Sequence, residues 1–188
     1  MPLTTIDPVS ALVVVDLQKG LVPALTDDPI TTAVKQATHL ATEFRRHGLP
    51  VVLVNVTGRP RGRTDTGRSA NSVAPPAGWA DLIDELDVQP TDHLITKRRR
   101  SAFHDTGLDT LLRDLGVTQV VLCGIATGSG VESTARSASD HGYHVVLATD
   151  AMGDPDAEAH RHSVERVFPK LGETATTAEV VDMMEGTR

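Results

Sequence analysis

Charged residues stand directly after two apolar segments of this sequence, and charged groups in such positions can do acid–base chemistry. Asp16 follows the apolar run 11–15, and Lys97 closes the segment 93–96. A third candidate is the glycine-rich segment 124–130, which leads into a helical pattern. The amino end of a helix offers partial positive charge and N–H donors. The sequence thus presents an acid, a base and a possible anion-binding helix start.

The elements that would position these groups can be predicted from the apolar pattern. The continuous apolar runs 11–15 and 51–54 are typical of buried strands. Between them, apolar residues recur at helical spacing over 30–47, and Gly48 followed by Pro50 ends that pattern. The chain therefore opens with a βαβ unit, whose crossover is almost always right-handed.

The alternation of strands and helices continues to the end of the chain. The segment 57–78 is rich in Gly, Pro, Arg, Ser and Thr and is predicted to be a long loop. Residues 1–188 are predicted to form one α/β domain, a three-layer αβα fold with a doubly wound, mainly parallel, six-stranded, Rossmann-like sheet. Ligands bind at the carboxyl ends of strands in such sheets, so the three candidates should converge on one cleft. Further strands are expected at 93–96, 119–123, 144–148 and 173–174, and further helices at 108–115, 129–141, 157–167 and 177–184.

Composition narrows the classes of partner. A net charge of −7 argues against nucleic acid and anionic membrane as partners. The single cysteine excludes an internal disulfide, and the start of the chain shows no targeting segment, so we expect a cytoplasmic protein. The eight histidines are scattered, and His160 and His162 would lie on different faces of their helix. A small-molecule substrate is the expected partner.

Three segments together resemble the isochorismatase-like cysteine hydrolases. They are residues 14–18 (VVDLQ), 96–103 (TKRRRSAF) and 124–136 (GIATGSGVESTAR), in that order. The resemblance implies the three-layer fold already predicted, and dimers or tetramers are common in the family. Family amidases use an Asp, Lys and Cys triad, in which the thiol attacks an amide carbonyl. By resemblance, Asp16 takes the acid–base role and Lys97 orients and stabilises charge.

The sequence departs from the amidase pattern at the nucleophile. That position falls on Gly130, which has no side chain and cannot form a covalent intermediate. Cys123 lies seven residues earlier inside a predicted strand, where a buried thiol behaves as a small apolar group with little thiolate. We therefore expect no acyl-enzyme chemistry.

Isochorismatases proper also have glycine at this point, because they hydrolyse a vinyl ether. In that chemistry a carboxyl group such as that of Asp16 protonates the alkene carbon, and water attacks the neighbouring carbon. Lys97 would keep Asp16 ionised, whereas burial would favour the protonated form that acid catalysis needs. The loop at Ala126 and Thr127 also differs from the Tyr-Ala-His stretch of isochorismatases, so the substrate can be a different molecule.

Substrate contacts and a cis peptide bond are further expectations. The resemblance implies a cis bond between Ile125 and Ala126, with backbone donors from Ala126 and Gly130 aimed at the substrate. Arginines of the loop after the second strand could hold a carboxylate, or could lie in solvent. The aromatic candidates could pack in the core instead of walling a pocket. The substrate-binding candidates are Gln18, Ala126, Thr127, Trp79, Phe103 and Arg59, with Arg61, Arg63 and Arg68 as further arginines.

No metal or cofactor is expected, and more than one function stays open. Metal-binding nicotinamidases carry an Asp-x-His type motif after the second strand, where residues 55–58 read NVTG. An isolated Asp16 could merely cap a turn, and Arg98 to Arg100 could be solvated surface. The leading hypothesis is a hydrolase without a covalent intermediate, acting on a small anionic molecule. The alternatives are a catalytically silent binding protein and a lyase or isomerase that uses Asp16.

Overall fold

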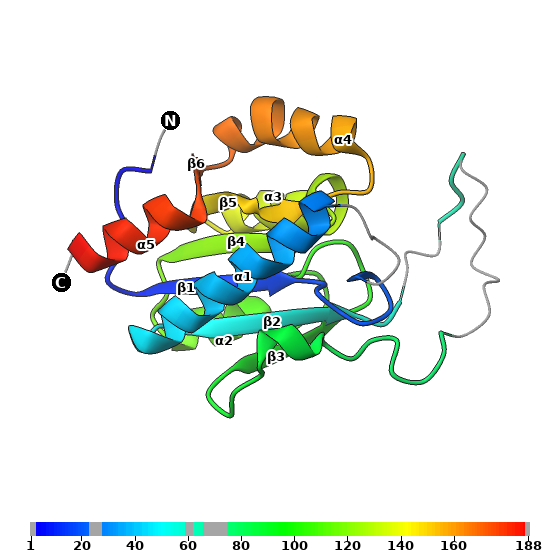
Figure 1. Cartoon of the computed structure of the whole chain (residues 1–188), viewed down its shortest axis with the longest axis horizontal. Coiled ribbons are helices and arrows are strands. Elements are labelled where there is room, and N and C mark those ends of the chain that lie inside the picture. The colour runs from blue at the N-terminus through cyan, green and yellow to red at the C-terminus, as the bar shows by residue number, and fades with distance from the viewer. Residues whose placement is uncertain (1–2, 23–27, 59–61, 66–74, 187–188) are drawn as a thin grey trace.

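Six parallel strands form one sheet in the order β3-β2-β1-β4-β5-β6. The structure is a computed structural model that describes residues 3–22, 28–58, 62–65 and 75–186. The chain runs outward from β1 to one edge and then returns to β4, so the direction of winding reverses between these two strands (Figure 1). The strands are β1 (Ser10–Val15), β2 (Val51–Val56), β3 (His93–Lys97), β4 (Gln119–Ile125), β5 (His144–Gly153) and β6 (Glu173–Ala175). This reversal is where doubly wound folds bind ligands.

The register of the strands aligns the ends that carry the candidate residues. Val15 pairs with Gly124 of β4, and Val56 of β2 pairs with Lys97. Asp16 follows Val15 directly, so its side chain starts at the same sheet edge as Lys97 and the residues after β4. The register therefore brings the three candidates to the same edge of the sheet.

Helices cover both faces of the sheet, as the three-layer prediction requires (Figure 1). The helices α1 (Asp28–Arg46) and α5 (Thr177–Gly186) pack on one face, where Leu12, Val14 and Leu53 point. The other face carries α2 (Leu108–Asp114) and α3 (Glu132–Asp140) over alternate residues of the same strands. The strands are buried on both sides, which explains their continuous apolar sequences.

Three elements differ from the sequence prediction. β5 continues to Gly153, beyond the apolar run, because Met152 and Gly153 pair with Gly124 and Ile125 at the end of β4 after a shift in register. The predicted helix 157–167 is α4 (Ala157–His162) followed by a π-helical segment, η4 (Ser163–Val167). A π-helical turn, η3 (Thr127–Val131), leads into α3. Short 3-10 turns also occur at η2 (Asp84–Leu86) and η5 (Phe168–Lys170).

Gly124 allows β1 and β4 to lie close together at their carboxyl ends. Its φ angle is +110°, and a Cβ atom there would overlap the backbone of Val15. Only glycine combines that conformation with so close a neighbouring strand.

Among the described residues, no helix is long and apolar enough to cross a membrane.

Candidate active site

A buried ion pair joins Asp16 and Lys97 at the carboxyl ends of β1 and β3. Lys97 Nζ donates to Asp16 Oδ2 over 2.6 Å, and the two side chains are 2% and 7% exposed. Lys97 also donates to the carbonyl oxygen of Arg99 at 3.2 Å, which holds the ammonium in place. The two residues are 81 positions apart in sequence, so the sheet alone brings them together.

The backbone turns the Asp16 carboxylate out of the strand. Its φ angle is +56°, in the left-handed region, while its N–H still donates to Val54 O at 2.9 Å. A non-glycine residue in this region is uncommon and is found disproportionately at functional sites. Asp16 Oδ1 is buried and accepts no hydrogen bond from the described residues. One carboxylate oxygen therefore remains for a substrate or a proton.

Burial and the ion pair act on Asp16 in opposite directions. Burial raises the pKa of the Asp16 carboxyl to about 6, although the Lys97 ammonium lowers it by its charge and its hydrogen bond. Of the two opposing effects foreseen from the sequence, burial prevails. A carboxyl group with this pKa is present in both protonation states near neutral pH, which suits proton transfer.

Gly130 lies against the same carboxylate. A Cβ atom built at position 130 would lie 3.0 Å from Asp16 Oδ2, 3.2 Å from Val15 Cγ1 and 3.3 Å from Ile125 O. Gly130 is buried within η3, directly before α3. Lys97 and Gly130 therefore both lie against the Asp16 carboxylate.

Cys123 is buried in β4 and does not belong to this arrangement. It packs with the α1 and α5 side of the sheet and is fully inaccessible. Burial raises the pKa of its thiol, and the charge of Asp150 raises it further. A neutral thiol without access to solvent cannot act as a nucleophile.

The loop after β4 carries the predicted cis peptide bond. The bond between Ile125 and Ala126 is cis, which confirms the prediction. The carbonyl oxygen of Ala126 accepts hydrogen bonds from the N–H groups of Ser129 (3.0 Å) and Val131 (3.2 Å). Thr127 is fully buried, and its hydroxyl lies 2.8 Å from His160 Nδ1. The Thr127 side chain thus contacts α4.

Gln18 anchors the backbone beside the site. Its side chain is inaccessible, donates to the carbonyl oxygens of Val56 and Trp79 at 3.2 Å each, and accepts from Val56 N–H at 2.8 Å. The indole ring of Trp79 lies over Gly20, where a Cβ atom would overlap it. Gln18 and Trp79 therefore join the turn after β1 to the end of the long loop.

The remaining substrate-binding candidates lie elsewhere or are not described. The Phe103 ring stacks on His141 with 5.1 Å between centroids and lies near Tyr143, at the end of α3 remote from Gly130. Arg63 is exposed, and Arg59, Arg61 and Arg68 lie outside the described residues. Arg98 and Arg100 are exposed, as expected for a solvated run.

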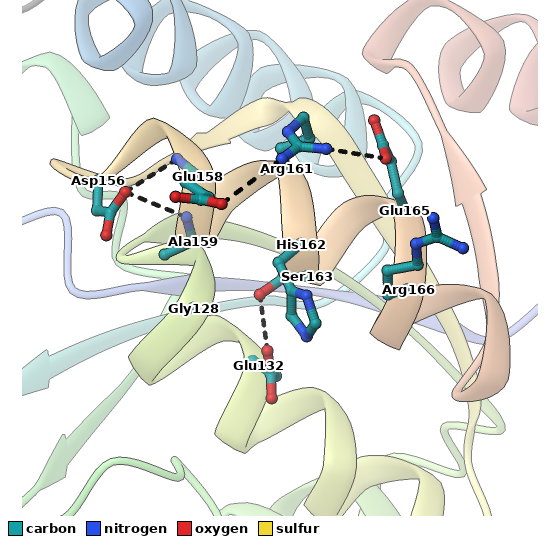
Figure 2. Close-up of a pocket in the computed structure, with 10 residues that line it drawn as sticks. All are labelled: Gly128, Glu132, Asp156, Glu158, Ala159, Arg161, His162, Ser163, Glu165 and Arg166. Carbon is teal, nitrogen blue, oxygen red and sulfur yellow. Dashed lines mark hydrogen bonds and ion pairs between the residues drawn. The ribbon is translucent and has the colours of Figure 1, made fainter.

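Contacts between η3 and the segment after β5 were not foreseen from the sequence. Asp154 Oδ2 accepts from Gly128 N–H at 2.8 Å, His160 contacts Thr127, and Ser163 Oγ donates to Glu132 Oε2 at 2.7 Å. Figure 2 shows the last of these beside a surface hollow of about 530 Å³ between α4, η4 and the start of α3. In the sequence, the only sign of these contacts is the helical spacing of polar residues over 154–163, and the same spacing is also typical of a solvent-exposed helix.

Metal binding finds no support in the described part of the chain. No group of three His, Cys, Asp or Glu residues there is arranged to hold a metal ion. The charged pair of Asp16 and Lys97 is itself unsuited to a cation, because the ammonium occupies one carboxylate oxygen.

Comparisons with known proteins place this chain, with its αβα fold, in the isochorismatase family. The model of the isochorismatase domain matches residues 10–179, so the chain belongs to this family of hydrolases. The isochorismatase family protein YwoC of Bacillus subtilis is 40% identical, over 94% of each chain. A solved isochorismatase family protein from Burkholderia thailandensis superposes with a TM-score of 0.89 at 37% identity, covering 96% of this chain and 98% of that one. Ureidoacrylate amidohydrolase RutB of Pantoea ananatis is 31% identical over 92% of this chain and 81% of its own.

Proposed function

We propose that this isochorismatase-family hydrolase cleaves a small anionic substrate without a covalent enzyme intermediate, with Asp16 as the acid–base group. The observation that carries the proposal is the position of Gly130 against the Asp16 carboxylate. A Cβ atom there would lie 3.0 Å from Oδ2, so position 130 is where a nucleophile activated by Asp16 would stand. Glycine cannot form a covalent bond through a side chain, so the attacking group must be water.

Acid catalysis fits the state of Asp16. Its pKa of about 6 leaves about one molecule in ten protonated at pH 7. The unpartnered Oδ1 can deliver that proton to the alkene carbon of a vinyl ether. Water then adds to the carbon that bears the ether oxygen, and the adduct breaks into a ketone and an alcohol. Lys97 orients the carboxyl group through its hydrogen bond to Oδ2.

An anionic substrate fits the charges at the site. The carboxylate of Asp16 is balanced by the Lys97 ammonium 2.6 Å away, so a bound anion meets no net negative charge from the pair. The run from η3 into α3 (127–140) begins beside Asp16, and its partial positive charge favours an anion there.

Amide hydrolysis through a thiol is not supported, although a relative is named as an amidohydrolase. The only cysteine of the chain, Cys123, is buried on the opposite face from α3. A second candidate function follows from the same missing thiol: the chain binds a metabolite beside Asp16 and Lys97 without turning it over.

The test is an assay of the purified protein on isochorismate, other small vinyl ethers and small amides. We expect turnover of a vinyl ether, and a loss of about a hundredfold or more in kcat for Asp16→Asn, which keeps the shape but cannot supply the proton. Asp114→Asn changes an exposed carboxylate of α2 and serves as the matched control. Turnover of amides alone would contradict the proposal, and tight binding without turnover would favour the binding protein.

A further inference from the structure

The segment that follows β5 (residues 154–163) makes three hydrogen bonds to residues 127–132, which we call the active-site turn. Asp154 accepts from Gly128 N–H at 2.8 Å, His160 Nδ1 lies 2.8 Å from Thr127 Oγ1, and Ser163 donates to Glu132 at 2.7 Å. The first two contacts fall at the start of η3, and the third falls at the first residue of α3. Together they span both sides of Gly130.

Close packing accompanies these hydrogen bonds. A Cβ atom at Gly128 would lie 3.3 Å from Ala159 Cβ, 3.4 Å from Asp154 Oδ2 and 3.6 Å from Ser163 Oγ. Helix α4 therefore lies directly against the backbone of η3, without an intervening side chain. In Figure 2 Gly128, Ala159 and Ser163 lie along this contact.

The His160–Thr127 and Ser163–Glu132 contacts are partly buried, whereas the Asp154–Gly128 contact is exposed. Thr127 and Ser163 are buried, and His160 is half-buried on the inner side of α4. Burial lowers the pKa of His160, although the charge of Asp154 raises it, and the net effect favours the neutral ring. With its proton on Nε2, the ring accepts the Thr127 hydroxyl hydrogen at Nδ1. His162, two residues on, is exposed and faces the hollow (Figure 2).

We propose that α4 fixes the position of the active-site turn, a role that we call the clamp. His160 is then a positioning residue of the hydrolase that acts through Thr127. This inference rests on the proposed function, because it assumes that the turn around Gly130 contacts the substrate. Thr127 directly follows Ala126, so the hydroxyl contact fixes the rotation of the peptide groups that lead to Gly130. Among the described residues, no hydrogen bond or ion pair joins His160 to Asp16 or Lys97. His160 therefore acts on the geometry of the active-site turn.

The first experiment compares His160→Ala with His162→Ala, a histidine of the same helix on its other side. We expect His160→Ala to lower kcat tenfold or more while KM changes little, because small displacements of a reacting geometry cost rate. His162→Ala should leave both constants unchanged. His160→Asn places a polar atom near the Nδ1 position and should restore most of kcat. Equal activity of the two alanine variants, or no rescue by asparagine, would overturn the clamp.

Thr127 offers a milder test if His160→Ala folds poorly. Thr127→Val keeps the shape but removes the hydroxyl, and Thr127→Ser keeps the hydroxyl. We expect the valine variant to lose kcat and the serine variant to retain it. In the double variant with His160→Ala, Thr127→Val should add little further loss, because both changes break one contact. Additive losses would contradict a shared role.

A readout without substrate separates failure of the clamp from failure of the proposed function. Gly130→Cys places a thiol at the turn, and its alkylation by iodoacetamide reports the local geometry. We expect adding His160→Ala to change the alkylation rate threefold or more, and adding His162→Ala to leave it unchanged. Identical rates in the two backgrounds would overturn the clamp, even where no substrate is turned over.

Discussion

Gly130 lies so close to Asp16 that a single methyl group at position 130 would begin 3.0 Å from the carboxylate Oδ2. The contact relates a residue after β4 to a residue after β1, at the point where the winding of the sheet reverses. Because position 130 carries no side chain, our proposal is that a substrate atom meets the carboxylate at this point.

The first prediction concerns pH. With Asp16 as the general acid, kcat/KM should follow the protonated fraction of a group whose pKa is about 6. We expect kcat/KM to rise about tenfold between pH 7 and pH 5 and to level off below pH 5. Initial rates across this range, corrected for folded fraction, provide the measurement. A rate that falls as the solution becomes more acidic would show that Asp16 works as a base.

The second prediction concerns the partner of Asp16. Lys97→Met removes the ammonium and leaves a carboxylate buried without compensation, which costs about 3–5 kcal/mol of unfolding free energy at pH 8. Without Lys97 the pKa of Asp16 rises further, because the opposite charge lowered it. The cost should therefore shrink as the pH falls to 5, where Asp16 is protonated and neutral.

Denaturant unfolding at both pH values checks this second prediction. Lys170→Met alters an exposed lysine at the end of η5 and should be nearly neutral at either pH. A loss of stability for Lys97→Met that is the same at pH 5 and pH 8 would exclude an uncompensated carboxylate as its cause.

The third prediction concerns thiols. The native protein should not react with the thiol reagent DTNB, because its single cysteine is inaccessible and has a raised pKa. Gly130→Cys should gain one reactive group and, if the remaining amidase machinery is intact, some activity on small amides. Ser139→Cys, toward the other end of α3, is the control for a thiol remote from Asp16. Reaction of the unmodified native protein would show that Cys123 is accessible.

Much of the fold and of the central site could be predicted from the sequence, for a physical reason. A parallel sheet buried on both faces needs continuous apolar strands, and the charged residue that ends such a strand stands out, as Asp16 does. The register that brings Val15 beside Gly124 then fixes which strand ends meet. Position along a strand is thus enough to predict that Asp16 and Lys97 meet, whereas Gly130 was identified through the resemblance to the isochorismatase-like hydrolases.

The parts that could not be predicted depend on side-chain direction. Gln18 lies in the same motif as Asp16, yet its amide is engaged with the backbone of Val56 and Trp79. The Phe103 ring stacks on His141, and His160 of α4 contacts Thr127 of η3. Spacing along the chain does not determine these orientations, because they follow from contacts between segments that are far apart in the sequence.

The fourth prediction tests whether Gln18 supports the structure or binds substrate. Its amide makes three hydrogen bonds to backbone groups. Gln18→Leu would remove this partner from the N–H of Val56 and the carbonyl of Trp79, which are partly buried. We expect a loss of about 2 kcal/mol in the free energy of unfolding, the usual cost of an unsatisfied buried polar group. Gln36→Leu, at a half-buried glutamine of α1, should have a smaller effect. If Gln18→Leu instead raised KM at unchanged stability, the amide would be a substrate contact, and the long loop would need another anchor beside Asp16.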